Sequence, residues 1–428
     1  MITTAASETA PSIRFLDRLF AGAALENVSF QLWDGTRWPD EKPRSASIVL
    51  QHPGSLRAMF SSGTEKGLAE AFLNDDFDIV GDIEAAFELV DVLARRAAPP
   101  WRTAFAHYYH LLRLPAKTGR RQAGRPFAAV GGQRHSLERD RRAVTFHYDV
   151  SNDFFRLWLD RRMVYSCAYF ERADDDLDTA QTAKLHHLCR KLRLQPGQRV
   201  LDIGCGWGGL AIYAARTCGV SVTGVTLSRP QAELAAALAN EAGVGRKVRI
   251  ECRDYRAMEE AESYDAIVSV GMSEHVGAEN LAAYFQQADR MLKPGGVFLN
   301  HAISDGVRPR RRLPSSFTDA YVFPDGDTPP IPVVLRAAES AGLEIRDVEN
   351  LREHYALTLR QWVRRLEANH AAALAFVNEA TYRVWRLYMA GSAHGFAGGE
   401  LAVYQVLLSK LEQNGGAHLP LTRRDWYI

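Results

Sequence analysis

Apolar and polar positions between residues 199 and 303 alternate between two patterns. Short apolar runs predict five strands, at Arg199–Ile203, Val220–Val225, Val248–Glu251, Tyr264–Val270 and Val297–Ile303. Helical spacing predicts helices between them, at Leu210–Thr217, Gln231–Ala242 and Leu281–Leu292. Strands that alternate with helices form a mostly parallel sheet with helices on both faces, so we expect an α/β fold here.

The two ends of the chain have other patterns. Residues 358–414 are predicted to be largely helical, because one helical face gathers the apolar residues Leu359, Trp362, Val363 and Leu366. Near the amino end, residues 48–50 and 56–60 are predicted to be short strands, and helical stretches lie on either side of Asn74–Gly81. This part therefore mixes strands and helices, as an α+β domain does.

A basic stretch, residues 111–142, separates the predicted smaller α+β domain (residues 1–110) from the main domain (residues 143–428). Its only acids are Glu138 and Asp140, against the basic residues Arg113, Lys117, Arg120, Arg121, Arg125, Arg134, Arg139, Arg141 and Arg142. Glycines interrupt it, so we expect a flexible linker. Together with Arg308 and Arg310–Arg312 it predicts electrostatic contact with an anionic membrane surface, the alternative being an ordinary solvated linker.

Composition narrows the class of protein. The 428 residues exceed one typical domain, and 46% hydrophobic with 24% charged residues is typical of a globular protein. A net charge of +1 gives no general attraction for nucleic acid. Five cysteines without a Cys-x-x-Cys pair indicate a reduced, cytoplasmic protein with no metal site. The amino end lacks a secretory pattern, and no apolar run of about 18 residues predicts a membrane span.

The segment Val200–Gly209, where a strand is predicted to pass into a helix, carries the strongest motif. Its glycines Gly204, Gly206 and Gly209 fit G-x-G-x-x-G, a pattern that suits close approach of the backbone to a ligand. A dinucleotide site needs an acid at the end of the second strand, and Gly224–Ser228 contains none. Asp202 instead ends the first strand, where a carboxylate suits the cationic ammonium and sulfonium end of S-adenosylmethionine. A glycine turn without a ligand is the alternative.

The next two strand ends offer partners for the rest of that cofactor. The hydroxyl of Thr226 and the amide of Gln231 are predicted to hold the ribose. Asp254 follows the third strand, where its carboxylate is predicted to accept from the adenine amino group. A plain strand-end cap is the alternative for Asp254.

The chain resembles the cyclopropane fatty acid synthase family, which includes the mycolic acid cyclopropane synthases. The resemblance spans about residues 145–410 and rests on the segments His147–Phe155, Tyr165–Phe170, Leu201–Gly209, Val268–Gly277 and Asn300–Ile303. It implies a Rossmann-like class I methyltransferase domain. The first 140 residues resemble the family's amino-terminal lipid-handling domain only loosely.

The resemblance also implies a bicarbonate ion as the base and a set of residues that hold it. These would be the side chains of Glu274, His301 and Tyr355 with the main chain of Cys167 and Ile303, while Tyr165 and Ser166 would reach the methionine carboxylate. An alkene attacks the methyl group and becomes a carbocation, so the site must be dry, and a proton must then leave the new methyl group. Taken singly, Glu274 is typical of a helix start and His301 of a structural histidine, and Cys167 needs no nucleophilic role.

The implied function is a cyclopropane-fatty-acyl-phospholipid synthase that acts on the cis double bonds of unsaturated chains in membrane phospholipids. The expected location is cytoplasmic, at the inner face of the membrane. Three alternatives stay open: an alkene C-methyltransferase that gives branched chains, a small-molecule methyltransferase, and a non-catalytic lipid-binding protein. The assembly, a monomer or a homodimer, also stays open.

Overall fold

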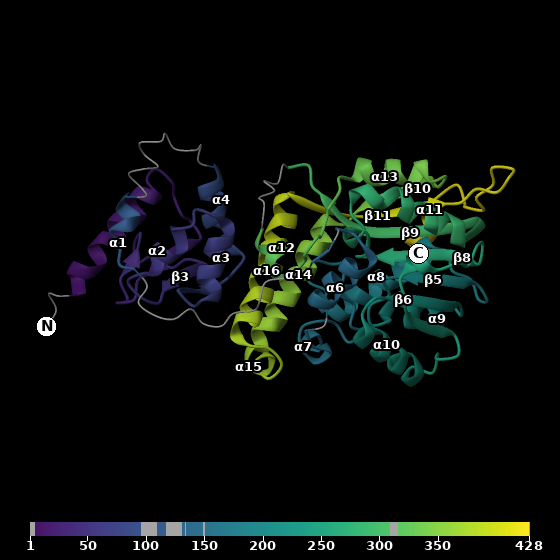
Figure 1. Cartoon of the computed structure of the whole chain (residues 1–428), viewed down its shortest axis with the longest axis horizontal. Coiled ribbons are helices and arrows are strands. Elements are labelled where there is room, and N and C mark those ends of the chain that lie inside the picture. Colours follow the sequence, from purple (N-terminus) through teal and green to yellow (C-terminus); the bar gives the residue numbers. More distant parts are fainter. Residues whose placement is uncertain are drawn as a thin grey trace. The chain divides into compact units, whose positions relative to one another are not determined.

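The computed structural model describes residues 5–95, 109–116, 131–132, 134–148, 150–308 and 316–427. Its contacts divide the chain into two compact units, whose elements are labelled in Figure 1. The first unit joins Met1–Phe127 with Arg312–Tyr321 and Asn378–His394, and the second contains the remainder. The predicted smaller domain lies within the first unit, which also includes two segments from much later in the chain.

The first unit is built on a four-stranded sheet in the order β2-β1-β3-β4. Its strands are β1 (Val28–Gln31), β2 (Arg37–Trp38), β3 (Ala46–Leu50) and β4 (Phe77–Gly81). Strands β1 and β3 are parallel, and the other neighbours are antiparallel. Its helices are α1 (Ala5–Leu19), α2 (Ser55–Phe60), α3 (Glu65–Leu73), the 3₁₀ helix η1 (Ala85–Phe87), α4 (Glu88–Arg95), α12 (Phe317–Tyr321) and α16 (Glu379–Gly398) as far as His394.

Two predictions for this unit differ from the structure. The predicted strand at residues 48–50 is confirmed as part of β3, but residues 56–60 form helix α2, not a strand. The buried side chains of α2 include Leu56 and Met59, a spacing of three that fits a helix. The stretch Asn74–Gly81, left between two helices, contains strand β4, whose Phe77 and Ile79 are buried in alternation.

Arg383 ties the α16 segment to the rest of the first unit. Its guanidinium donates to the backbone oxygens of Phe72 and Phe77 over 2.8 and 3.4 Å and pairs with Asp75 at 2.8 Å. The same cation lies 5.0 Å from the ring centre of Phe72. Because Arg383 is only 8% exposed, these contacts replace the water that a guanidinium requires.

The second unit contains a seven-stranded sheet in the order β10-β11-β9-β8-β5-β6-β7. Its strands are β5 (Arg199–Ile203), β6 (Ser221–Thr226), β7 (Val248–Cys252), β8 (Tyr264–Val270), β9 (Leu292–Asp305), β10 (Glu344–Asn350) and β11 (Leu401–Ser409). Strands β5 to β9 are parallel, and β11 runs antiparallel to both β9 and β10. The prediction of a mostly parallel sheet with interleaved helices is confirmed.

The helices of this unit connect the strands. They are α6 (Leu137–Tyr148), α7 (Asn152–Arg156), α8 (Leu177–Lys191), α9 (Gly209–Thr217), α10 (Arg229–Glu241), α11 (Leu281–Met291), α13 (Ile331–Ser340), α14 (Arg352–Ala368) and α15 (His370–Ala373). The 3₁₀ helices are η2 (Tyr255–Ala257), η3 (Ser273–His275), η4 (Ala278–Asn280) and η5 (Arg424–Trp426). The predicted basic linker lies partly outside the described residues, and its end, from Leu137, opens α6.

One prediction for the carboxyl end is wrong. Residues 358–414 are not helical throughout, because residues 401–409 form strand β11 in the interior of the sheet. The strand is buried along almost its whole length, so its apolar residues do not alternate with polar ones. Such a run cannot be distinguished from a buried helix by periodicity. Strand β10, which the sequence pattern did not predict, is its neighbour.

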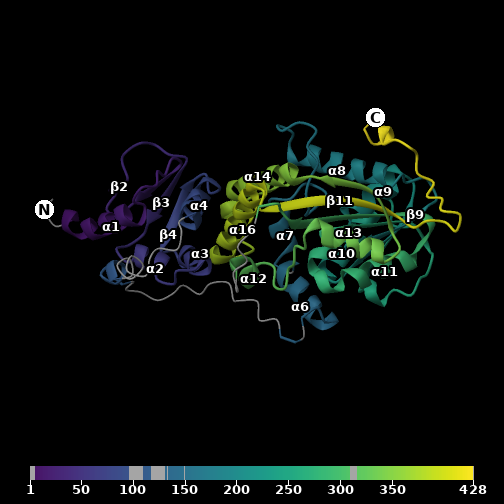
Figure 2. The same ribbon diagram turned by 90° about the horizontal axis from the view of Figure 1, so that it is seen from above.

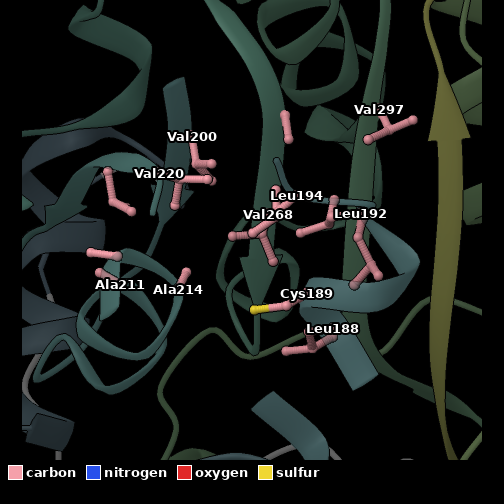
Figure 3. Packing of buried hydrophobic residues seen from close by; sticks show 14 of the residues in the cluster. Leu188, Cys189, Leu192, Leu194, Val200, Ala211, Ala214, Val220, Val268 and Val297 are labelled. Carbon is pink, nitrogen blue, oxygen red and sulfur yellow. The ribbon is translucent and has the colours of Figure 1, made fainter. Parts of the chain in front are cut away.

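Alternating side chains of the parallel strands pack into two apolar layers, one on each face of the sheet. Figure 2 shows helices α8 and α9 on one side of the strands and α11 and α13 on the other. Figure 3 shows part of the first layer, in which Val200, Val268 and Val297 of the sheet pack with Leu188 of α8 and with Leu192, which follows this helix. The opposite side chains, such as Leu201 and Ile267, join the second layer with α11 and α13. This two-sided packing fixes the strand ends that carry the candidate site.

Among the helices of the described residues, none is both long enough and apolar enough to cross a membrane.

Candidate active site

A cavity of about 220 Å³ opens at the carboxyl ends of the central parallel strands of the second unit. Strands β6 and β8 flank β5 on opposite sides, and β5 is followed in the chain by β6. In parallel sheets of this kind, ligands bind where the order of successive strands reverses, beside the central strand. All the residues predicted to bind the cofactor line this one cavity: Tyr165, Ser166, Asp202, Gly204, Gly206, Thr226, Gln231 and Asp254.

The glycine-rich turn between β5 and α9 brings bare backbone to the cavity wall. Gly204 has φ +78°, and a Cβ there would lie 2.9 Å from Cγ of Met272. Gly206 has φ +54° and open space where a Cβ would lie. Glycine adopts positive φ without strain, so both positions leave room for a ligand against the main chain.

Asp202 ends strand β5 and is 3% exposed. Its Oδ2 is buried and has no hydrogen-bond partner among the residues that the structure describes. Burial raises the pKa of this carboxyl to about 7, although the nearby Lys184 ammonium lowers it. A buried carboxylate oxygen without a partner, facing a cavity, suits a ligand cation. The cavity therefore fits the ammonium end of S-adenosylmethionine.

Thr226 and Gln231, the predicted ribose partners, are held together. The hydroxyl of Thr226 donates to Oε1 of Gln231 over 2.8 Å, and both side chains are buried. Because Oε1 of Gln231 accepts this bond, the amide nitrogen is left as the donor for a ligand. The contact also fixes the rotamers of both side chains before any ligand binds.

Asp254, the predicted adenine partner, has two protein contacts already. It accepts from the backbone nitrogen of Arg256 over 2.8 Å, which caps helix η2, and its two oxygens pair with the guanidinium of Arg256. The same guanidinium lies 3.0 Å from Asp140. The cap suggested as the alternative is therefore present. A bond to adenine stays a prediction, since carboxylate oxygens have further lone pairs.

Glu274 belongs to η3, which follows strand β8, and is 7% exposed. Strand β8 ends at Val270, so the longer β9 continues beside η3, where the backbone nitrogen of Ile303 donates to Oε1 of Glu274 over 2.7 Å. Its Oε2 is buried and without a partner among the described residues. Burial raises the pKa of this carboxyl to about 7, against the lowering effect of the Ile303 bond. The main chain of Ile303 was predicted to contact bicarbonate, and its nitrogen is already bonded to Glu274.

His301 lies on β9 and is 2% exposed. Register places it opposite Gln405 of β11, whose Nε2 lies 3.3 Å from Nδ1 of His301. An amide nitrogen can only donate, so Nδ1 accepts and a neutral ring carries its proton on Nε2. Burial, and then the charges of two lysines, hold the pKa of His301 well below its ordinary value. Its Nε2 is buried with no partner in the described part of the chain.

None of the five residues predicted to hold the base lines the cavity itself, but Glu274 and His301 lie next to residues that do. The backbone nitrogen of Gly271, which lines the cavity, donates to the backbone oxygen of His301. Glu274 is followed directly by His275, which also lines the cavity. The unpartnered atoms are a carboxyl oxygen and an imidazole N–H. One accepts and the other donates, as the hydroxyl and the oxygens of a bicarbonate ion require, so the residues fit the ion.

Cys167 and Tyr355 lie at the start of α14. The thiol of Cys167 is 1% exposed and donates weakly to the backbone oxygen of Leu351 over 3.7 Å. Burial raises the pKa of this thiol far above its ordinary value, so it stays protonated and is a poor nucleophile. The ring of Tyr355 packs 4.6 Å from that of Phe396 and 6.0 Å from that of Trp362.

Several lining residues were not predicted from the sequence, among them Tyr148, Lys184, Trp207 and Arg256. Lys184 had a detectable signal, because it interrupts the buried face of α8 that contains Ala180, Leu185 and Leu188. Among the described residues, no group of three His, Cys, Asp or Glu side chains could hold a metal ion.

The predicted membrane contact falls largely outside the described residues, which omit Lys117, Arg120, Arg121, Arg125 and Arg310–Arg312. Of the remaining linker cations, Arg139 forms two bonds with Asp325, at 2.5 and 2.8 Å, and Arg142 pairs with Glu138. Part of the basic stretch is therefore neutralised within the second unit.

Comparison with known proteins adds to this geometry. The sequence profile of the family described as mycolic acid cyclopropane synthetase matches residues 135–406. A "Probable fatty acid methyltransferase" of Pseudomonas putida is 38% identical over 410 residues, which cover 94% of this chain and 96% of the relative. The "Cyclopropane-fatty-acyl-phospholipid synthase" of Escherichia coli K12 is 40% identical over 269 residues, which cover 63% of this chain and 68% of the relative.

Solved structures give the same picture for the second unit. The crystal structure of mycolic acid cyclopropane synthase CmaA1 "complexed with SAH and CTAB" is similar, with a TM-score of 0.59 and 39% sequence identity. The match covers 63% of this chain and 97% of that one.

Proposed function

The chain belongs to the mycolic acid cyclopropane synthetase family and is an S-adenosylmethionine-dependent methyltransferase, and on that premise we propose that it converts cis double bonds of phospholipid acyl chains into cyclopropanes. SAH, present in the related structure, is the demethylated form of this cofactor. The phospholipid substrate is supported by the name of the Escherichia coli relative. The proposed base is bicarbonate.

One observation carries the proposal. Oε2 of Glu274 and Nε2 of His301 are both buried and unpartnered among the described residues, next to residues that line the cofactor cavity. Leaving such atoms unpaired costs about 1–3 kcal/mol each, which a bound anion with a hydroxyl group offsets. A methyltransferase for ordinary nucleophiles has no need of a second, anion-binding pair beside its cofactor.

Each group has a distinct part in this chemistry. S-adenosylmethionine supplies the methyl carbon, and bicarbonate held at Glu274 and His301 would supply a base for the proton that leaves it. Asp202 binds the ammonium end of the cofactor, while the glycine-rich turn admits it close to the backbone. His301 donates from Nε2 and Glu274 accepts at Oε2, and the phenol of Tyr355 donates as a third contact. Burial of these groups excludes water, which would otherwise trap a carbocation.

A second outcome shares all these residues. The Pseudomonas putida relative, which aligns over nearly the whole chain, is named a probable fatty acid methyltransferase, and the second candidate is methyl transfer to the alkene without ring closure. Loss of a proton from the carbocation then gives a methylene branch, and a saturated methyl branch forms only when a hydride donor is added as reductant. The cofactor site and the substrate class are the same in both cases.

Product analysis distinguishes these outcomes. The purified protein is incubated with S-adenosylmethionine and vesicles of dioleoylphosphatidylglycerol, and the fatty acids are analysed by gas chromatography and mass spectrometry. We expect each modified chain to gain one CH₂ and to fragment as a cyclopropane. A methylene branch has the same mass with a different fragmentation, and a saturated methyl branch is two hydrogens heavier.

Bicarbonate dependence is tested in the same assay. In buffer freed of carbon dioxide we expect turnover to fall and to recover when bicarbonate is added. Unchanged turnover would exclude bicarbonate as the base. A branched product would show that the reaction is methyl transfer without ring closure. If the protein is folded and binds SAH but forms no modified lipid, the proposed substrate is wrong.

A further inference from the structure

Helix α8 presents two lysines to the protein interior with different surroundings. Lys191 is fully buried and pairs with Glu349 at 2.5 Å and with Asp347 at 3.5 Å. Lys184 lies two turns earlier and is 1% exposed. No carboxylate oxygen of the described residues lies within 4.0 Å of its Nζ, the distance at which an ion pair forms. Its ammonium lines the cofactor cavity instead. A buried, unpaired cation at a binding site calls for an explanation.

The one hydrogen bond of Lys184 within the described chain runs from Nζ to Oγ of Ser166, over 2.9 Å. An ammonium has three donors and no acceptor, so Ser166 accepts this bond and its own hydroxyl proton is available for another partner. Ser166 is 8% exposed and lines the cavity. The contact therefore makes Ser166 a hydrogen-bond donor toward the cavity.

The backbone that carries Ser166 is fixed from the same helix. The amide nitrogen of Gln181 donates to the backbone oxygens of Val164 and Ser166, over 3.3 and 2.8 Å. Gln181 and Lys184 lie three residues apart, on one face of α8. Helix α8 thus holds both the main chain and the side chain of this segment of the cavity wall.

The charges of the cavity are arranged for a zwitterion. Asp202 at the end of β5 offers a carboxylate, and Lys184 offers an ammonium, and both line the same cavity. Asp160, Cys167 and His301 also interact electrostatically with Lys184, and none of the three lines the cavity. An α-amino acid carries one group of each sign, so this pair matches the methionine end of the cofactor.

We propose that Lys184 is a positioning residue for the cofactor carboxylate: it orients the hydroxyl of Ser166 toward that group and supplies its counter-charge, while Gln181 fixes the backbone. The inference rests on the cofactor of the proposed function and not on the acyl substrate. For the methionine carboxylate the sequence resemblance had implied only Tyr165 and Ser166. The inference adds Lys184 in the cavity wall and Gln181 behind it.

The test compares two ligands by isothermal titration calorimetry. SAH has the amino-acid end, and 5′-methylthioadenosine lacks it but shares the adenosine and the thioether. For Lys184→Met we expect SAH affinity to fall about 10- to 100-fold while methylthioadenosine affinity changes by less than about twofold. Lys184→Gln, which keeps a donor to Ser166 without the charge, should lose less. Lys191→Met is the matched control, a buried lysine of the same helix, and should leave both affinities unchanged.

A double-mutant cycle with Ser166→Ala tests whether Lys184 acts through Ser166. We expect the two changes to be non-additive: the double variant should lose less than the sum of the two single losses, but more than Ser166→Ala alone, because the charge of Lys184 also acts directly on the carboxylate. Additive losses, equal losses of both ligands, or unchanged SAH affinity in Lys184→Met would each overturn the inference. Thermal unfolding checks folding, and Lys184→Gln carries the test if Lys184→Met does not fold. These titrations contain no acyl substrate. The inference about Lys184 is therefore tested independently of whether the protein forms cyclopropanes.

Discussion

At the scale of single residues, burial shifts the pKa values of the candidate site residues so that their neutral forms are favoured. Burial raises the pKa values of Asp202 and Glu274 to about 7 each and lowers those of Lys184, to about 8, and His301. Removing a charged group from water disfavours its charged form, so each shift has the same primary cause. In the proposed cofactor site, Asp202 and Lys184 become fully ionised when the oppositely charged groups of the cofactor bind, which couples ligand binding to proton release or uptake.

Asp202 makes cofactor binding depend on pH. In the free protein its pKa is about 7, and a bound ammonium favours the charged carboxylate, so the pKa falls on binding. The contribution of Asp202 to SAH affinity should therefore be complete above the free-state pKa of this carboxyl and decrease as the pH falls through it. Calorimetry from about pH 8 down to about pH 5.5 should record up to tenfold loss per unit below the pKa. Asp202→Asn should remove this dependence, and an unchanged profile in that variant would refute the assignment.

The proposed base pocket predicts a separation of binding from turnover. We expect Glu274→Gln and His301→Ala to lose at least about 100-fold in kcat while SAH affinity stays within about twofold, because the proposal assigns their unpartnered atoms to bicarbonate and not to the cofactor. Cys167→Ala should keep substantial activity, since only its main chain is involved. Loss of activity in a folded Cys167→Ala protein would point to a thiol mechanism instead.

At the scale of elements, strand β11 does most to organise the site. Its antiparallel insertion between β9 and β10 places Gln405 opposite His301 on one side and opposite Glu349 on the other. Glu349 in turn bonds His187 and Lys191 of α8. A polar row across three strands therefore supports His301 from behind. A shift of β11 by one residue would turn Gln405 to the other face of the sheet.

Replacing Gln405 by glutamate tests the tautomer of His301. A carboxylate can only accept, so it should draw the proton of His301 to Nδ1 and leave Nε2 without a donor. We expect a large loss of kcat with little change in KM for the cofactor. Nitrogen-15 NMR of histidine-labelled protein should show the proton of His301 on Nε2 in the wild type and on Nδ1 in Gln405→Glu. A wild-type ring protonated on Nδ1 would contradict the geometry.

The anchor of α16 predicts a stability effect in the first unit. Arg383→Met removes the donors to the backbone oxygens of Phe72 and Phe77. We expect a loss of about 2–3 kcal/mol in the free energy of unfolding of this unit, measured with a denaturant. Arg37→Met serves as the control, because Arg37 is exposed and its contact with Glu41 is 3.9 Å long. That variant should change stability by less than about 0.5 kcal/mol, and equal effects would argue against the anchor.

At the scale of the whole molecule, the family and the fold class expected from the sequence are both confirmed, and the second unit alone contains every candidate site residue. The domain boundaries at residues 110 and 142 remain a proposal. The first unit includes Asn378–His394, so a fragment ending at residue 110 would lack the helix that carries Arg383. We therefore propose that the smaller domain depends on the end of the chain for its stability.

Peripheral membrane contact is the proposal that concerns the whole chain. Charge reversal of Arg310, Arg311 and Arg312 to glutamate should weaken co-sedimentation with anionic vesicles, since each basic residue near such a surface contributes on the order of 1 kcal/mol. High salt should have the same effect, because it screens the attraction. Neutral vesicles should bind weakly in all cases.

The matched control reverses three exposed basic residues of the second unit that lie far from the cluster in the sequence, Arg229, Arg246 and Lys247. If binding is local to the arginine cluster, this variant should sediment like the wild type. Equal binding to anionic and neutral vesicles, indifferent to salt and to the cluster, would refute electrostatic docking. The enzyme assignment does not depend on this result.

The sequence by itself determined the features that depend on neighbouring residues. Runs of apolar residues located all five parallel strands, and the turn after β5 was recognisable because positive φ at Gly204 and Gly206 requires glycine. Asp202 could be assigned to a cation because its place at a strand end follows from the local pattern. The predicted cofactor residues accordingly line one cavity.

Only the tertiary structure decided which distant segments meet. Nothing in the local period of residues 401–409 distinguishes a buried strand from a helix, so the place of β11, and with it the partner of His301, depended on pairing across the sheet. The same holds for Lys184, whose contact with Ser166 arises from packing of α8 and not from sequence spacing. Long-range pairing and burial set the protonation of these groups, because desolvation depends on everything that surrounds a side chain in space.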